Sequence, residues 1–126
     1  MPDHYPTDIK LHQQSRKLEL VFDDGSEFKL SCEFLRVHSP SAEVRGHSAA
    51  QAVLQTGKEA VNITAIEAVG NYAVKLIFDD GHDTGLYTWD YLYDLGQQRE
   101  RYWQQYLRAL EAAGHHRDNE LGVDNV

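Results

Sequence analysis

Apolar and polar residues alternate along two stretches of the chain, and an aspartate–glycine pair interrupts each alternation. The first stretch covers residues 18–30 and breaks at Asp24-Gly25, and the second covers residues 72–86 and breaks at Asp80-Gly81. Successive side chains of a strand point to opposite faces, so alternation predicts strands with one buried face. Asp-Gly suits a tight turn because glycine accepts a positive φ. Each stretch therefore predicts a β-hairpin.

A hydroxyl residue follows each predicted hairpin at the point where a helix can begin. Ser31 and Thr88 hold these positions, with Glu33 and Asp90 in the first turns that follow. A hydroxyl oxygen can cap free backbone N–H groups, and a carboxylate is favourable near a helix N-terminus. The sequence Phe-Asp-Asp-Gly precedes both caps, at a spacing that differs by one residue. We therefore expect two copies of one hairpin–helix unit in a pseudo-symmetric domain.

The rest of the pattern completes an α+β fold. The further elements expected are an edge strand at Ile9 and Leu11, a helical turn from Ser39 to Gly46, a strand through Val61, Ile63 and Ile66, and a C-terminal helical segment over residues 89–110 with a break at Gly96 and a stop at Gly114. Together they predict an antiparallel sheet of about six strands with a long C-terminal helix packed on it. We expect one folded domain over residues 1–114 and a disordered acidic tail over residues 115–126.

Composition narrows the choice of function. The chain has 126 residues, the size of one domain, and its 12 Lys+Arg against 20 Asp+Glu give a formal net charge of −8. This charge disfavours nucleic acid as a partner. No signal peptide or membrane span is expected, so membranes are disfavoured too and the expected localisation is cytoplasmic. Cys32 is the single cysteine, which excludes an internal disulfide and a multi-cysteine metal site within the chain.

Candidate catalytic and metal-binding groups are few. A cysteine nucleophile needs a nearby base, but Cys32 stands in a short amphipathic helix, where burial and low reactivity are expected. The paired aspartates before Gly25 and Gly81 are assigned to the hairpin turns. The side chains able to bind a metal show no ligand-type spacing; they are His38, His47, His82, Asp83 and Cys32.

One segment, residues 36–47, is rich in hydrogen-bonding groups. It contains Arg36, His38, Ser39, Ser41, Arg45 and His47. Two interpretations stay open: a site for an anion or a partner's carboxylate, and a solvated loop that caps itself.

Three runs of sequence resemble the gamma-butyrobetaine hydroxylase-like N-terminal domain family, in its small bacterial form. They are FLRVHSPSAEVRGH at residues 34–47, VGNYAV at residues 69–74 and FDDGHDTGLYTWDYL at residues 78–92, and the likeness extends from Ile9 to Ala113. The resemblance implies a domain that precedes the catalytic domain in carnitine-biosynthesis dioxygenases, holds a structural zinc through three cysteines and a histidine, and contributes to dimer contacts. A related domain is appended to a ParA-like ATPase that serves as an iron–sulfur scaffold in chloroplasts.

The resemblance also shows where this chain departs from the family. The zinc-binding Cys-Pro-Cys-x-x-Cys positions fall on Ser39, Ser41 and Val44, and only the histidine has a counterpart, His82. Hydroxyls and an isopropyl group do not replace zinc thiolates, so the inherited zinc site is expected to be absent. The oxygenase domain is not part of this sequence, so the resemblance argues against hydroxylase activity. We expect His82 to contact the loop that holds Ser39, either as a structural latch or as part of a binding site.

The leading hypothesis is a non-catalytic adaptor that binds a protein partner and has a link to iron or iron–sulfur handling. Its expected surface comprises Arg36, His38, Ser39, Ser41, Arg45, His47, His82, Tyr87 and Trp89. The alternative is an accessory protein that binds a metal or a small anion through His82 and the 36–47 loop, in which zinc or iron would be the metal. A domain that only forms a homodimer is the third possibility.

Overall fold

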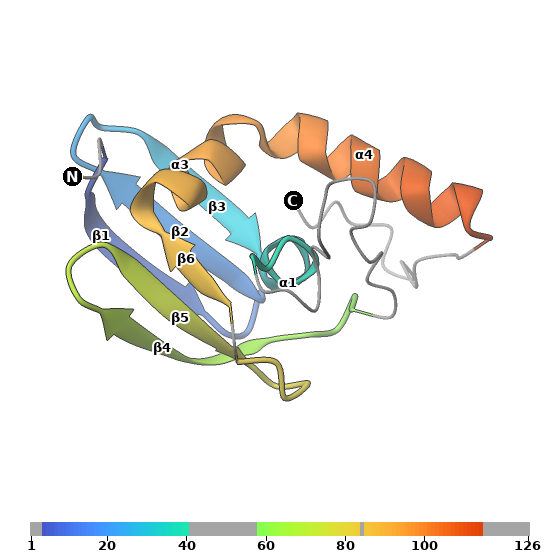
Figure 1. The fold of residues 1–126 in the computed structure, drawn as a ribbon, viewed down its shortest axis with the longest axis horizontal. Helices are drawn as coiled ribbons and strands as arrows, with labels where there is room; N and C mark the ends of the chain where they lie inside the picture. Colours follow the sequence, from blue (N-terminus) through green and yellow to red (C-terminus); the bar gives the residue numbers. More distant parts are fainter. Residues whose placement is uncertain (1–3, 41–57, 84, 115–126) are drawn as a thin grey trace.

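The computed structural model describes residues 4–40, 58–83 and 85–114, and these residues form six strands and three helices (Figure 1). The elements are β1 (Pro6–His12), β2 (Lys17–Phe22), β3 (Glu27–Ser31), α1 (Cys32–Val37), β4 (Ile63–Val69), β5 (Ala73–Phe78), β6 (Leu86–Thr88), α3 (Trp89–Gln97) and α4 (Arg99–Ala112). The α+β class is therefore confirmed. The helical turn expected up to Gly46 and the tail expected over residues 115–126 lie outside the described residues.

The strands form two antiparallel sheets, which corrects the single sheet expected from the sequence. The orders are β1-β2-β3 and β4-β5-β6, and no ladder joins the sheets within the described residues. Alternation fixes which face of each strand is buried, and it is satisfied equally by one sheet or by two. The two sheets approach each other where Asn62 Nδ2 donates to Gln13 O at 2.9 Å and Gln13 Nε2 donates to Ile63 O at 3.1 Å.

The expected repeat of a hairpin and a helix is present in the backbone geometry. Ser31 and Thr88 cap α1 and α3 with nearly the same angles, φ −69° and ψ 152° against φ −69° and ψ 158°. Each hydroxyl oxygen accepts from the N–H three residues later. Gly25 and Gly81 have φ of 87° and 92° at equivalent places in the two turns. The two units therefore share turn and cap, as the repeated sequence predicted.

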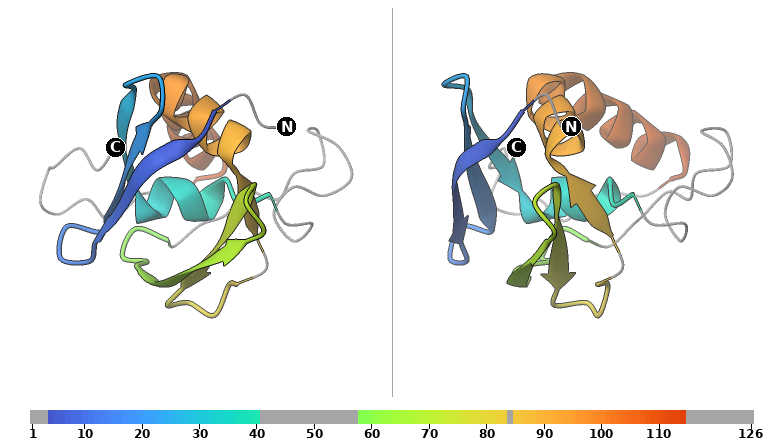
Figure 2. Two further views of the ribbon diagram at one scale, coloured as in Figure 1. Left: turned by 90° about the vertical axis from the view of Figure 1, so that its left-hand side faces the viewer. Right: turned by 60° about the vertical axis from the view of Figure 1, so that its left-hand side comes forward.

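Helix α1 lies between the two sheets, and all six of its residues are buried (Figure 2). A helix enclosed on every side must bury its polar side chains as well as its apolar ones. In α1 these are Glu33 and Arg36, which are 2% and 7% exposed. Glu33 Oε2 accepts from the hydroxyl of Tyr106 on α4 at 2.9 Å. The buried polar side chains of α1 thus have hydrogen-bond partners that are distant in the sequence, such as Tyr106 for Glu33.

The C-terminal helical segment is divided at Gln98, not at Gly96 as the sequence suggested. Gly96 continues α3, and a Cβ there would lie 2.4 Å from Cγ of the Phe28 ring. The glycine therefore permits close packing of α3 on β3. Trp103 and Tyr106 of α4 are each 5% exposed, which confirms that they belong to the core. No helix in the described ranges has the length and apolar character needed to cross a membrane.

Gly81→Ala is expected to destabilise the protein by about 1 kcal/mol or more, because an L side chain is disfavoured at φ 92°. No atom lies within 4 Å of a Cβ at this position, so the effect isolates the backbone angle. Urea denaturation measures it, and Gly25→Ala should cost a similar amount. An unchanged midpoint for Gly81→Ala would contradict the strain argument.

Trp103→Ala is expected to lower the free energy of unfolding by roughly 3–5 kcal/mol, through lost burial and the cavity left behind. The matched control is Gln105→Ala on the exposed side of α4, expected to change stability by less than about 0.5 kcal/mol. Chemical denaturation of both variants provides the comparison. Equal midpoints for the two variants would show that α4 does not depend on this packing.

Candidate functional site

The C-terminal end of α1 meets the β5–β6 turn, and an ionic cluster joins them. Arg36 Nε donates to Asp80 Oδ2 at 2.9 Å, and Lys58 Nζ donates to the same oxygen at 2.8 Å. The other oxygen, Asp80 Oδ1, accepts from the backbone N–H of His82 at 3.1 Å and closes the turn. The Asp80 carboxylate therefore stabilises the turn through one oxygen and pairs with both the Arg36 and Lys58 cations through the other.

The equivalent aspartate of the first unit has the same turn role and a different second partner. Asp24 Oδ1 accepts from Ser26 N at 2.9 Å, which matches the Asp80–His82 contact, but Asp24 Oδ2 accepts from the Tyr93 hydroxyl at 2.5 Å. The repeated Asp-Gly turn thus carries an ion pair in the second unit and a neutral donor in the first. The ionic cluster is specific to the second unit.

The electrostatics of Asp80 follow from these contacts. Partial burial alone would raise the pKa of Asp80, but hydrogen bonds from Lys58, the His82 backbone and Arg36 outweigh it and lower the pKa from 3.8 to about 2. The carboxylate is therefore ionised across the physiological pH range and stays paired with the cations.

His82 reaches the segment that follows α1, which confirms the expected contact. His82 Nε2 and Ser39 Oγ are 2.8 Å apart and share a hydrogen bond. Ser39 is fully buried, and it is so close to Gly85 that a Cβ at that glycine would lie 2.3 Å from Ser39 Oγ. The serine is thus enclosed between the imidazole and the backbone leading into β6.

Two tyrosines of the second unit satisfy carbonyl groups at the end of α1. Tyr87 donates its hydroxyl to Leu35 O and Tyr91 donates to His38 O, both at 2.5 Å. The last carbonyls of a helix have no partner within the helix, and buried ones need donors from elsewhere. The second unit therefore caps the first unit's helix as well as pairing with its arginine.

Burial corrects the expectation that this region forms an exposed surface. Arg36 of α1, Ser39, Tyr87 of β6 and Trp89 of α3 are 7%, 0%, 0% and 7% exposed. His38 and His82 are partly exposed. The remaining predicted positions, Ser41, Val44, Arg45 and His47, lie outside the described residues.

The candidate nucleophile Cys32 is buried, and the candidate base His38 is only partly exposed. Desolvation raises the pKa of the Cys32 thiol to about 11, so little thiolate forms at neutral pH. Burial lowers the pKa of His38, partly offset by the hydrogen bond between its Nδ1 and Phe34 O at 2.8 Å. Neither residue has the accessible, activated form that nucleophilic catalysis requires.

The donor set does not fit the family's zinc. Two zinc ligands are held roughly 3.5 Å apart, because each lies about 2.0–2.3 Å from the metal. Ser39 Oγ and His82 Nε2 are at hydrogen-bonding distance instead, and the other two thiolate positions carry serine and valine. No group of three or more His, Cys, Asp or Glu side chains converges within the described residues. His82 thus acts here through a hydrogen bond to protein.

Sequence reasoning missed two members of the cluster. Asp80 was assigned only to its turn, and Lys58 had no local signal, because its partner lies 22 residues further along the chain. Only the structure shows that the helix containing Arg36 is buried on every side, and a buried guanidinium needs a carboxylate or carbonyl partner such as Asp80.

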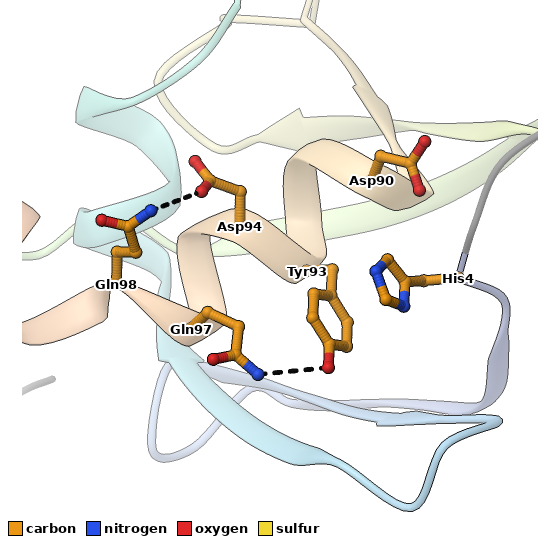
Figure 3. A pocket seen from close by; sticks show the side chains of 6 residues that line it. All are labelled: His4, Asp90, Tyr93, Asp94, Gln97 and Gln98. Atoms are coloured by element: carbon orange, nitrogen blue, oxygen red, sulfur yellow. Dashed lines mark hydrogen bonds between the residues drawn. The ribbon is translucent and has the colours of Figure 1, made fainter.

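A separate open cleft of about 750 Å³ lies beside α3, lined by His4, Asp90, Tyr93, Asp94, Gln97 and Gln98 (Figure 3). The His4 ring stacks on Tyr93 with centroids 3.5 Å apart. Asp94 accepts from Gln98 Nε2 at 2.9 Å and from the Tyr102 hydroxyl at 2.7 Å. These contacts tie the cleft's polar groups to helix packing, so the ionic cluster is the stronger candidate site.

Comparison with known proteins identifies relatives that span most of the chain. A family model described as gamma-butyrobetaine hydroxylase-like, N-terminal, matches residues 9–93. A protein with a solution NMR structure is 55% identical, and the match covers 93% of this chain and 89% of that chain with a TM-score of 0.78. A second protein with a solution NMR structure is 50% identical, and the match covers 91% of this chain and 90% of that chain with a TM-score of 0.79. A protein of unknown function from Acidithiobacillus ferrooxidans, of the DUF971 family, is 42% identical, with 72% of this chain and 91% of that chain covered and a TM-score of 0.61. The search of curated proteins found no match.

The charge on Asp80 is expected to stabilise the fold at neutral pH and not in acid. Because the folded state lowers its pKa from 3.8 to about 2, the contribution is full above about pH 4 and disappears as the pH falls to about 2. After allowance for solvent screening, Asp80→Asn should cost about 1 kcal/mol at pH 7 and almost nothing near pH 2. Denaturation across this range measures it, with exposed Asp83→Asn as the control. A penalty for Asp80→Asn that is independent of pH would contradict the ion pair's role.

Proposed function

The chain belongs to the gamma-butyrobetaine hydroxylase-like N-terminal domain family, and we propose that it is a non-catalytic protein-interaction module. In this proposal the ionic cluster holds the two hairpin–helix units together and shapes the surface offered to a partner. The proposal includes a link to iron or iron–sulfur handling, which is supported by the resemblance to the scaffold-associated domain.

The observation that supports the proposal is the direct hydrogen bond between Ser39 and His82. These residues stand where the resemblance places two of the family's zinc ligands, and here they bind each other. Cys32, the one thiol, is buried with a raised pKa, so it supplies no accessible nucleophile. Ser39 and His82 thus stabilise the fold through their hydrogen bond, and Cys32 is buried. This arrangement favours a binding role over a catalytic role.

The surface proposed to contact a partner is the β5–β6 turn surface, defined as Lys58, residues 79–83 and Leu86. Asp83 is exposed, and Leu86 at the start of β6 is 42% exposed, one of two large hydrophobic side chains with this exposure in the described part of the chain. Strand β6 is at the edge of its sheet. An exposed leucine beside charged turn residues gives the mixture of apolar and polar groups typical of protein interfaces.

Asp83→Lys tests the proposal by reversing a charge on this surface. The variant and the wild-type chain serve as baits in the source cells, and each captured protein is quantified. The matched control is Asp8→Lys on β1, an exposed strand residue of the other sheet. We expect Asp83→Lys to reduce capture of a specific partner at least about tenfold, because a reversed charge at an interface is strongly unfavourable. Asp8→Lys should leave that capture unchanged.

Two results would contradict the proposal. One is the same capture profile for Asp83→Lys and the wild-type chain, which would exclude the turn surface as the contact. The other is loss of capture in both variants, which would indicate a general effect of charge. Thermal denaturation of both variants verifies that each is folded.

A further inference from the structure

The outer face of the first sheet carries basic side chains at the end nearest the β1–β2 turn. Directly paired residues of neighbouring strands point to the same face of a sheet, as do alternate residues of one strand. The register therefore places Lys10, Glu19 and Lys29 in one row across β1, β2 and β3. His12 and Lys17 lie in the next row, closer to the turn. The helices and the second sheet lie on the other side of these strands (Figure 2, right), and Lys10, His12 and Lys29 are exposed.

Glu19 is the carboxylate at the centre of these two rows, and several basic side chains share it. Its Oε1 lies 2.9 Å from His12 Nε2, and this hydrogen bond lowers the pKa of Glu19. The charges of Lys29 and Lys10 lower the pKa of Glu19 further. Lys17 and Lys29 form no ion pair with another described residue. A single carboxylate thus stands among more positive groups than it can pair with.

The other carboxylates near this end leave most of its positive charge in place. Asp8 and Glu27 lie one row further from the β1–β2 turn, and of these Asp8 pairs with Lys10, with Oδ2 and Nζ 3.4 Å apart. Asp79, which belongs to the second sheet's side, accepts from a backbone N–H of the β4 side at 3.1 Å. The cations that form no ion pair within the described residues at this end are Arg16, Lys17 and Lys29.

Arg16 places a further cation where the backbone does not favour an arginine. It is the non-glycine residue with a positive φ, 55°, in the described part of the chain. Glycine or asparagine is preferred in this conformation, because other L side chains crowd the backbone. The carbonyl of Arg16 accepts from the Cys32 N–H at 2.9 Å, a contact that any residue can make. The turn therefore does not require this exposed side chain, and a conformational cost at one position points to a role for the side chain itself.

We propose that the basic end of the first sheet is a docking surface for an extended, carboxylate-rich segment of another protein. The basic end is defined as Lys10, His12, Arg16, Lys17 and Lys29. The inference goes beyond the proposed function, because this surface lies on the other sheet and uses no residue of the β5–β6 turn surface. It also occurs in a chain with a formal net charge of −8, so it is a local exception to the charge of the molecule. A partner of opposite charge is steered to such an exception.

The spacing of the cations fits an extended segment. Lys10 and Lys29 stand on the two outer strands of the sheet, two strand spacings or about 10 Å apart. Alternate side chains of an extended chain lie roughly 7 Å apart on one side, and flexible lysine stems can follow them. The Lys10 side chain is 59% exposed, so access does not depend on any opening of the fold. A long polyanion such as nucleic acid fits less well, because it would extend over the acidic remainder of the chain.

The test uses two peptides that differ only in charge. Acetyl-Glu-Ala-Glu-Ala-Glu-Ala-amide and its Gln counterpart are titrated into the full chain at matched ionic strength, and backbone amide NMR signals are followed. We expect the Glu peptide to shift the signals of Lys10, Lys17 and Lys29 in a saturable way and to leave that of Gly81 unchanged. The Gln peptide should shift none of them. Inorganic phosphate and a short oligothymidylate are the further probes, for a small anion and for a nucleic acid.

Variants locate the binding. The double variant Lys17→Gln/Lys29→Gln should weaken the Glu peptide by about tenfold, because two unpaired cations are lost. Arg16→Asn should weaken it by about threefold and leave the melting temperature unchanged or higher, because asparagine tolerates the positive φ. The matched control is Arg108→Gln, which removes an exposed cation from α4 and should leave binding unchanged. Asp8→Lys removes the ion-pair partner of Lys10 and should strengthen binding.

Each outcome decides the proposal. Equal binding of the Glu and Gln peptides, no binding of either, or undiminished binding by the double variant overturns it. Equal weakening by Arg108→Gln also overturns it, since the effect would then follow net charge and not place. Tighter binding of phosphate or oligothymidylate than of the Glu peptide overturns the assignment to a protein segment. The titration is independent of partner capture by the β5–β6 turn surface, so either surface can fail while the other stands.

Discussion

The ion pair between Arg36 and Asp80 is the constraint around which the two halves of this protein are arranged. Helix α1 is buried on every side, and it carries a guanidinium that cannot be left unpaired in such surroundings. Its partner comes from the turn of the other hairpin, 44 residues away in sequence. The β5–β6 turn lies over the end of α1 through this contact, and the Tyr87 hydroxyl donates to the carbonyl of Leu35 in the same region. The packing of α1 against the second hairpin thus involves the pairing of a charge as well as the burial of apolar surface.

The turn aspartates of the two hairpin–helix units make the same backbone contact but different side-chain contacts. Both turns use an aspartate oxygen to hold the N–H two residues later, at 2.9 Å in the first unit and 3.1 Å in the second. The second carboxylate oxygen, Oδ2, is not used by the turn and accepts a hydrogen bond from side chains of other elements. It takes the Tyr93 hydroxyl in the first unit and the arginine–lysine pair in the second. Only the second turn therefore carries a charged cluster, and the pseudo-symmetry of the backbone does not extend to the chemistry.

The family's zinc positions acquire a different physical role in this chain. A metal joins distant segments by binding several ligands at once, and a chain without the thiolates needs another connection. Here a serine–histidine hydrogen bond and the neighbouring ion pair connect the end of α1 to the β5–β6 turn. Hydrogen bonds fix this geometry without supplying a Lewis acid or an activated thiol. These contacts hold the end of α1 against the β5–β6 turn and leave Nη1 of Arg36 buried without a hydrogen bond.

The sequence by itself determined the local features, because each depends on neighbouring residues. Gly25 and Gly81 specified turns through their positive φ, and Ser31 and Thr88 specified helix starts through their hydroxyls. The His82–Ser39 contact came from family resemblance and not from any local rule. Tertiary structure alone decided that the strands divide into two sheets, that Gly96 serves packing against Phe28, and that Tyr87 is buried. It also decided that Lys58 joins Asp80, because alternation and capping say which face of an element is buried but not which distant element covers it.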